Sequence, residues 1–361
     1  MTTRSKWQSL PTEAINASSL GIDKLAADDI VDLMMHEDRR MLDAVRRERE
    51  RIAVGVEMVA TALRKGGRVM FVGAGTSGRL GILESAEMPP TFSTEPDLVQ
   101  AIMAGGRDAI FAAKEGVEDN YEEGARSVTR LHPTKKDIVV GVSASGMTQF
   151  VRGALTRARK AGARIIFVTC DPGTELQTFV DLTIAPGVGA EVIAGSTRLK
   201  AGTATKLVLN MLTTGAMIRI GKTYGNLMVD VQTGSEKLKD RARRIVNIVT
   251  GLEYLEADKL LKKAHWNVKA AIVMQKTGVP YPKASSCLRR AHDSMREAIG
   301  EDIEPRLRGM LQGHAEAAAI NGGAPKAPPT PRTETTSVRT ERTRPRPSAR
   351  RGGPSGLPIR P

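Results

Sequence analysis

The segment Arg68-Val-Met-Phe-Val-Gly-Ala-Gly-Thr-Ser-Gly-Arg-Leu-Gly81 decides the fold class, because it joins a short apolar run to a helical pattern through a series of glycines. Residues 68–73 are rich in β-branched and aromatic side chains, which favours a buried strand ended by glycine. A helical pattern follows from Leu80 to Ala86. A strand followed closely by a helix is the repeating unit of parallel sheets.

The same alternation continues along the chain. Further short apolar runs predict strands at 98–103, 137–142, 163–169 and 181–184. Helical patterns occur between them at 108–117, 122–131 and 150–160. The sequence therefore predicts an α/β fold with a doubly wound, mainly parallel sheet that is covered on both faces.

Helical patterns also flank the predicted sheet. Apolar residues recur at helical spacing over 28–62 before the first strand, and over 204–220, 235–249, 258–275 and 286–299 after the last. We therefore predict four regions. They are an N-terminal helical region that packs on the core (1–62), the α/β domain (63–235), a C-terminal helical module (236–300), and a linker with a disordered basic tail (301–361).

The tail carries half of the net charge. The chain has a formal charge of +14, and residues 324–361 hold nine basic residues against two acidic ones, together with nine of the 19 prolines. Such a segment buries too little apolar surface to offset the entropy of ordering. Attraction to nucleic acid or anionic lipid is an alternative. We favour a solvated extension, because no aromatic residues interleave the arginines for base stacking.

Composition excludes several classes of protein. Two cysteines, Cys170 and Cys287, are too few for a disulfide framework and lack the paired spacing of a zinc or iron–sulfur site. The first residues contain no apolar signal region, and polar residues interrupt the longest apolar stretch, 207–220. We expect a cytoplasmic protein that uses no metal.

Two glycine-rich loops carry the main functional signal. Gly73 to Arg79 lies between a strand and a helix, and Ser143 to Thr148 repeats this arrangement after the strand at 137–142. Glycines let backbone amides converge, and the helix N-terminus attracts an anion. The first loop also matches a dinucleotide motif, but no acidic residue follows the second strand to hold a ribose.

The pair of loops therefore predicts a site for a phosphorylated small molecule without an organic cofactor. Such loops also occur for steric reasons alone, but two of them at the carboxyl ends of neighbouring strands favour a phosphate site. The predicted substrate-binding residues are Thr76, Ser77, Gly78, Ser143, Ser145 and Thr148.

Carboxylates near these loops are candidates for proton transfer. Most such residues, including Glu84, Glu115 and Asp119, are usually solvated charges or helix caps. Glu87 differs because two prolines follow it at a predicted helix end, where it would be held rigidly and partly desolvated. No Ser-His-Asp or Cys-His grouping can be recognised for nucleophilic catalysis.

Several motifs in order closely resemble the N-acetylmuramic acid 6-phosphate etherase family. They are Gly73-Ala-Gly-Thr-Ser-Gly-Arg-Leu-Gly81, Glu87-Met-Pro-Pro-Thr91, Glu115-Gly-Val-Glu-Asp119, Gly195-Ser-Thr-Arg-Leu-Lys-Ala-Gly-Thr203 and Gly225-Asn-Leu-Met-Val-Asp230. The likeness covers roughly Leu10 to Ile299. It implies a sugar-isomerase (SIS) domain of the doubly wound type.

The resemblance implies cleavage of a D-lactyl ether in cell-wall sugar recycling, giving N-acetylglucosamine 6-phosphate and D-lactate. Glu87 and Glu118 match the two essential glutamates of the family. We assign Glu87 as the proton donor to the lactate oxygen and Glu118 as the base at C2, although Glu115 lies in the same motif. The family needs no cofactor and pairs as homodimers with the active site near the interface.

The chain departs from the common family pattern at four positions. Met147 and Gln149 stand where Arg and Pro are expected, Met88 replaces Cys, and Glu84 replaces Asp. Loss of the arginine weakens phosphate or lactate binding if that side chain reaches the ligand.

The sequence is also compatible with two other functions. A sugar-phosphate sensor, such as the glucokinase regulatory protein, binds without turnover and needs neither glutamate. An aldose–ketose isomerase on the same fold leaves lactate attached. Detection of D-lactate separates both from the etherase.

Overall fold

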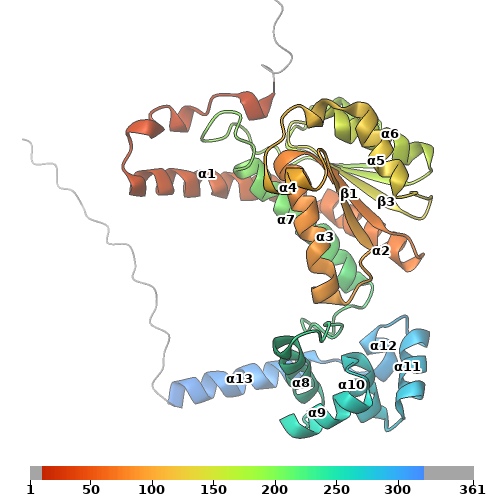
Figure 1. Ribbon diagram of the computed structural model, residues 1–361. Helices are drawn as coiled ribbons and strands as arrows, with labels where there is room; N and C mark the ends of the chain where they lie inside the picture. The colour runs from red at the N-terminus through yellow and green to blue at the C-terminus, as the bar shows by residue number, and fades with distance from the viewer. Residues whose placement is uncertain (1–9, 321–361) are drawn as a thin grey trace, which may run out of the picture. The chain divides into compact units, whose positions relative to one another are not determined.

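The computed structural model describes residues 10–320, and the part from α1 to α7 contains a five-stranded sheet (Figure 1). Its strands are β1 (Val69–Gly73), β2 (Val99–Met103), β3 (Ile138–Val142), β4 (Arg164–Val168) and β5 (Leu182–Ile184). They lie in the order β2-β1-β3-β4-β5, and each neighbouring pair is parallel. The predicted α/β class with a doubly wound sheet is confirmed.

Helices precede, connect and follow the strands. Those up to the end of the sheet region are α1 (Ala27–Arg47), α2 (Arg49–Arg64), α3 (Gly75–Phe92), α4 (Asp108–Phe111), α5 (Tyr121–Arg130), α6 (Gln149–Lys160) and α7 (Lys200–Arg219). The later ones are α8 (Glu236–Thr250), α9 (Tyr254–Lys263), α10 (Val268–Thr277), α11 (Tyr281–Arg290), α12 (Met295–Ile299) and α13 (Glu304–Ile320).

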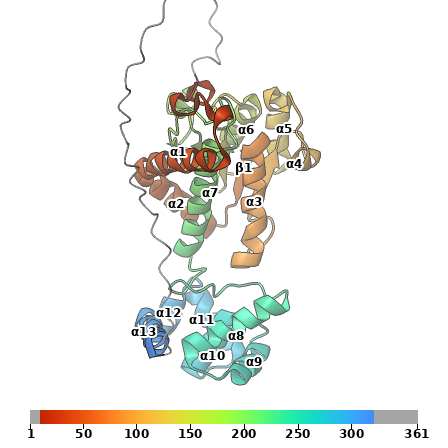
Figure 2. The same ribbon diagram turned by 90° about the vertical axis from the view of Figure 1, so that its left-hand side faces the viewer.

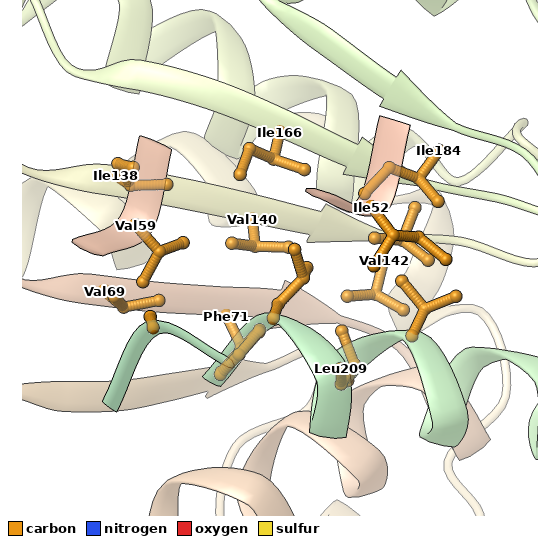
Figure 3. Packing of buried hydrophobic residues seen from close by; sticks show 14 of the residues in the cluster. Ile52, Val59, Val69, Phe71, Ile138, Val140, Val142, Ile166, Ile184 and Leu209 are labelled. Atoms are coloured by element: carbon orange, nitrogen blue, oxygen red, sulfur yellow. The ribbon is translucent and has the colours of Figure 1, made fainter. Parts of the chain in front are cut away.

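Both faces of the sheet are covered, which explains why its strands read as continuous apolar runs. On one face, Ile52 and Val59 of α2 and Leu209 of α7 cluster with strand residues such as Phe71 and Val140 (Figure 3). Helices α1 and α3 join this layer. The opposite layer, formed by α5 and α6, packs on the other side of the same strands (Figure 2).

The residues after α7 build an apolar core of their own from α8 to α12. The single helix expected at 258–275 is two helices, because His265 and Trp266 adopt positive φ and Asn267 caps α10 by accepting the N–H of Ala270 at 2.8 Å. The expected boundaries of the four regions stay predictions. Helix α13 lies within the expected linker. The chain divides into two compact units after Gly309. The basic tail at 324–361 lies outside the described residues.

A buried ion pair joins α1 to the start of α7. The side chains of Glu37 and Lys200 are only 2% and 4% exposed, and Asn16 donates a further hydrogen bond of 2.9 Å to the same carboxylate. Burial alone would raise the pKa of Glu37. Hydrogen bonds from Lys200, Asn16 and Arg40 outweigh it and lower this pKa to about 2.

Replacing Glu37 by Gln should therefore change how stability depends on pH. The folded-state pKa lies below the unfolded one, so ionised Glu37 stabilises the fold above about pH 4.5, and this contribution is lost as the pH falls toward 2. At neutral pH, Glu37→Gln should lower the free energy of unfolding by about 3–5 kcal/mol, because Lys200 keeps its buried charge without a counter-charge. Urea denaturation at several pH values measures both effects.

Glu50→Gln is the matched control, because the Glu50 side chain is 87% exposed. It should leave stability and its pH dependence unchanged. The same acid sensitivity in Glu37→Gln and in the parent would contradict the role of the pair.

Candidate functional site

The topology brings the two glycine-rich loops together. Strand β2 lies on one side of β1 and β3 lies on the other, so the direction of sheet growth reverses between them. In open α/β sheets, ligands bind at the carboxyl ends of the strands beside such a reversal. The loops that follow β1 and β3 lie side by side at this point.

The first loop leads into α3, and no side chain caps the N-terminus of that helix. Thr76 and Ser77 lie in its first turn. Gly78 is buried, and a Cβ atom there would lie 2.8 Å from the carbonyl oxygen of Gly73. The absence of a side chain at Gly78 therefore allows α3 to approach β1 closely, which is a steric role.

The second loop places hydroxyl groups beside the first. The Ser143 and Thr148 hydroxyl oxygens are 2.8 Å apart, and Ser145 Oγ accepts the N–H of Met147 at 3.3 Å. Thr148 is the N-cap residue of α6, but its side chain makes no capping hydrogen bond. Both loops thus present hydroxyl groups at a helix N-terminus, as phosphate binding requires.

These loops line one cavity of about 310 Å³. Its walls include most of the residues predicted from the sequence, namely Thr76, Ser77, Ser143, Ser145, Thr148 and Glu118. Glu115 also lines it. Gly78 and Glu87, the other two predicted site residues, do not.

Glu118 reaches the cavity from the short 3-10 helix η4 (Val117–Asp119). It is half-buried, whereas Glu115 is exposed. Arg79 of α3 holds the preceding segment, because its guanidinium donates to the carbonyl oxygens of Ile110 and Ala109, each at 2.8 Å. The helix expected at 108–117 ends early at Phe111, so the segment with both glutamates lies along the cavity.

The position of Glu87 corrects one sequence expectation. Helix α3 continues through Pro89 and Pro90 to Phe92, and Glu87 is exposed on it rather than partly desolvated. Eight residues separate Glu87 from Arg79, the last α3 residue at the cavity, which is about 12 Å along a helix axis. Glu87 therefore does not line the cavity of its own chain.

The buried carboxylate on α3 is Glu84, which we had expected to be solvated. It is 3% exposed and accepts hydrogen bonds from Asn210 and Thr213 of α7. Burial raises the pKa of Glu84, and these two hydrogen bonds act in the opposite direction. Glu84 therefore ties α3 to α7 within the fold.

Sequence reasoning missed part of the cavity wall. Leu10 and Glu13 near the N-terminus and Gly195 and Thr197 before α7 also line it. The N–H of Gly195 donates to the carbonyl oxygen of Thr12 at 3.1 Å, which joins the two segments. The motif beginning at Gly195 was a usable signal, but nothing around Glu13 indicated a site.

Between residues 10 and 320, no group of three or more His, Cys, Asp and Glu side chains is placed to hold a metal ion. In the same range, no helix has the length and apolarity needed to span a membrane.

The sheet and its loops resemble those of known proteins. The family model "Glucokinase regulatory protein N-terminal SIS domain" matches residues 51–159, which contain β1, β2, β3 and both loops. A phosphoheptose isomerase structure from Neisseria gonorrhoeae aligns with a TM-score of 0.41 and 18% identity, covering 52% of this chain and 97% of that one. The first three strands and their two loops therefore match an SIS-type domain.

Curated relatives narrow the class. N-acetylmuramic acid 6-phosphate etherase of Gloeobacter violaceus is 50% identical over 265 residues, 73% of this chain and 87% of the relative. The enzyme of the same name from Microcystis aeruginosa is 44% identical over 315 residues, 86% of this chain and 98% of the relative. The chain belongs to the N-acetylmuramic acid 6-phosphate etherase family.

Proposed function

We propose that the chain acts as its family name states and cleaves the D-lactyl ether of N-acetylmuramic acid 6-phosphate. The products are N-acetylglucosamine 6-phosphate and D-lactate, so the enzyme is a carbon–oxygen lyase of cell-wall recycling. The observation that carries this function is one cavity that joins two phosphate-type loops to the carboxylate of Glu118. We place the enzyme in the cytoplasm, where a phosphorylated sugar is retained.

The chemistry needs proton transfers and a held phosphate. In the ring-opened sugar, the C1 aldehyde acidifies the C2 proton. A base removes this proton, and the C3–O bond breaks as an acid protonates the departing lactate oxygen. Water then adds to C3 of the unsaturated aldehyde and restores the proton at C2.

Glu118 is the base in this proposal. It is half-buried and lines the same cavity as the Ser/Thr loops, so a sugar whose phosphate binds to those loops can place its C2 beside this carboxylate. Arg79 fixes the preceding backbone and thereby positions it. General acid–base groups placed in this way each contribute about 10²–10⁴-fold to a rate.

Glu87 is the acid, and we propose that it acts on the substrate bound by the partner subunit of a homodimer. Glu87 does not line the cavity of its own chain. It lies on an exposed face of α3, one turn after Leu83, which is 47% exposed. Val31, Met35 and Leu42 of α1 are also more than half exposed at helical spacing. Apolar side chains exposed in this way are typical of an interface between subunits.

The alternative functions make different demands. A sensor or an isomerase uses the phosphate loops, which the SIS family model covers, but releases no D-lactate. Incubating the purified protein with N-acetylmuramic acid 6-phosphate and assaying D-lactate tests the function. Failure to release lactate from this compound would reject it.

The phosphate loops support a separate prediction. Ser77→Asp should raise the KM for the 6-phosphate by at least about tenfold, because a carboxylate would repel the phosphate at the uncapped start of α3. Ser77→Ala is the matched control and should cost less. Steady-state kinetics with the phosphorylated and unphosphorylated sugars measure both variants. Equal turnover of the two sugars by the parent enzyme would contradict a phosphate-anchored site.

A further inference from the structure

The proposed mechanism assigns a binding partner to only one of the two anionic groups of the substrate. The substrate carries two anionic groups, the phosphate on C6 and the carboxylate of the lactyl group on C3. Among the described residues that line the cavity, Glu13, Glu115 and Glu118 are acidic and Arg79 and Lys114 are basic. A lactyl carboxylate placed among three carboxylates needs a cation beside it.

Arg79 is already engaged with the backbone. Its guanidinium donates to the carbonyl oxygens of Ile110 and Ala109 at 2.8 Å, and to that of Ala112 at 3.4 Å. These bonds hold the segment between β2 and η4. Releasing Arg79 to a ligand would leave three carbonyl oxygens without this donor, so Arg79 is a positioning residue.

Lys114 is held much more loosely. Its ammonium pairs with Asp108 at 3.0 Å, and the two side chains are 40% and 81% exposed. Exposed ion pairs contribute little to stability, because water screens them and ordering two long side chains costs entropy. A ligand carboxylate can therefore replace Asp108 as the partner of Lys114 at little cost.

The position of Lys114 assigns it to one end of the substrate. Its side chain lies over Gly105, just after β2, where a Cβ atom would be 3.4 Å from Lys114 Cδ. Lys114 thus belongs to the same segment as Glu118, on the β2 side of the phosphate loops. With Glu118 at C2, the lactyl group on the adjacent C3 lies near this segment, whereas C6, which carries the phosphate, is four bonds from C2.

We propose that Lys114 binds the carboxylate of the lactyl group and so distinguishes the lactyl ether from the same sugar phosphate without it. The proposal rests on the proposed function, because it takes the lactyl sugar as the substrate. It makes Lys114 a specificity-determining residue. The phosphate remains on the hydroxyls of the two loops.

Binding measurements test this role without turnover. In the Glu118→Gln background, calorimetry would give the Kd of N-acetylmuramic acid 6-phosphate and of N-acetylglucosamine 6-phosphate, which lacks the lactyl group. Adding Lys114→Met should raise the Kd of N-acetylmuramic acid 6-phosphate by about tenfold or more, since a charge-assisted contact is lost. Its effect on the second sugar should stay within about twofold. Lys114→Arg should retain most of the difference between the two sugars.

Lys135→Met is the matched control, because Lys135 is an exposed lysine just before β3, at the opposite end of the strands. It should leave both affinities unchanged. If Lys114→Met lowers the affinity for both sugars equally, Lys114 binds the phosphate and the proposal is overturned. If neither affinity changes, the proposal is also overturned. In both cases, lactate release by the parent enzyme would still support the proposed function. Absence of lactate release by the parent enzyme would reject that function, whatever the effect of Lys114→Met.

Discussion

Replacing Glu118 by Gln is expected to reduce D-lactate release by at least about a hundredfold, with little change in the affinity for the sugar phosphate. Glutamine is nearly the same size as glutamate but cannot take a proton from C2. Glu118 lies half-buried in the wall of the cavity on the short helix η4, and glutamine has nearly the same shape, so the substitution should not disturb the fold. Coupled assay of D-lactate and calorimetry with N-acetylglucosamine 6-phosphate measure the two effects.

Isotope exchange identifies the step that is lost. The C2 proton should exchange with solvent deuterium in the parent enzyme and not in Glu118→Gln, whereas loss of the acid should leave exchange intact. Glu115→Gln is the matched control, because Glu115 lines the same cavity but is exposed. If Glu115→Gln abolishes exchange and Glu118→Gln does not, the two assignments within this motif must be reversed.

Local sequence patterns were enough to predict the sheet. The central strands β1 and β3 are buried along their whole length, so a short apolar run predicts each of them regardless of which helix covers it. The strand-to-helix loops after β1 and β3 could also be predicted, since two such loops with glycines and hydroxyl side chains at neighbouring strands favour a phosphate site. Their meeting in one cavity followed from the order of the strands.

Features that depend on contacts distant in sequence were harder to predict. Glu84 and Glu87 occupy one helix three residues apart, yet one is buried against α7 and the other is exposed. The helical period alone does not tell which side meets another helix. Glu13 reaches the cavity only because its segment pairs with Gly195, far along the chain.

The prolines after Glu87 were misread for a physical reason. Proline lacks an N–H group and usually ends a helix, so Pro89 and Pro90 favoured a helix end close to Glu87. The helix instead runs to Phe92, and Ser93 closes it in the left-handed conformation by donating its N–H to the carbonyl oxygen of Pro89. The extra turn leaves Glu87 within a regular helix, with its side chain in solvent.

Subunit complementation is the strongest expected effect of the proposed dimer. Glu87→Gln and Glu118→Gln homodimers should each be nearly inactive, with losses of at least about a hundredfold. A heterodimer of the two, isolated with two different affinity tags, should recover about half of the parent activity. One of its cavities contains the intact Glu118 of one chain and receives the intact Glu87 of the other, while the second cavity lacks both.

A site completed within one chain predicts the opposite result, since every cavity of the heterodimer would then lack one glutamate. The distance along α3 favours the shared site, because about 12 Å of helix separates Glu87 from Arg79, the last α3 residue at the cavity of its own chain. The parent protein carrying both tags controls for the tags, and light scattering checks that each preparation is dimeric. An inactive heterodimer, or a fully active monomer at micromolar concentration, would show that Glu87 does not serve the partner's substrate.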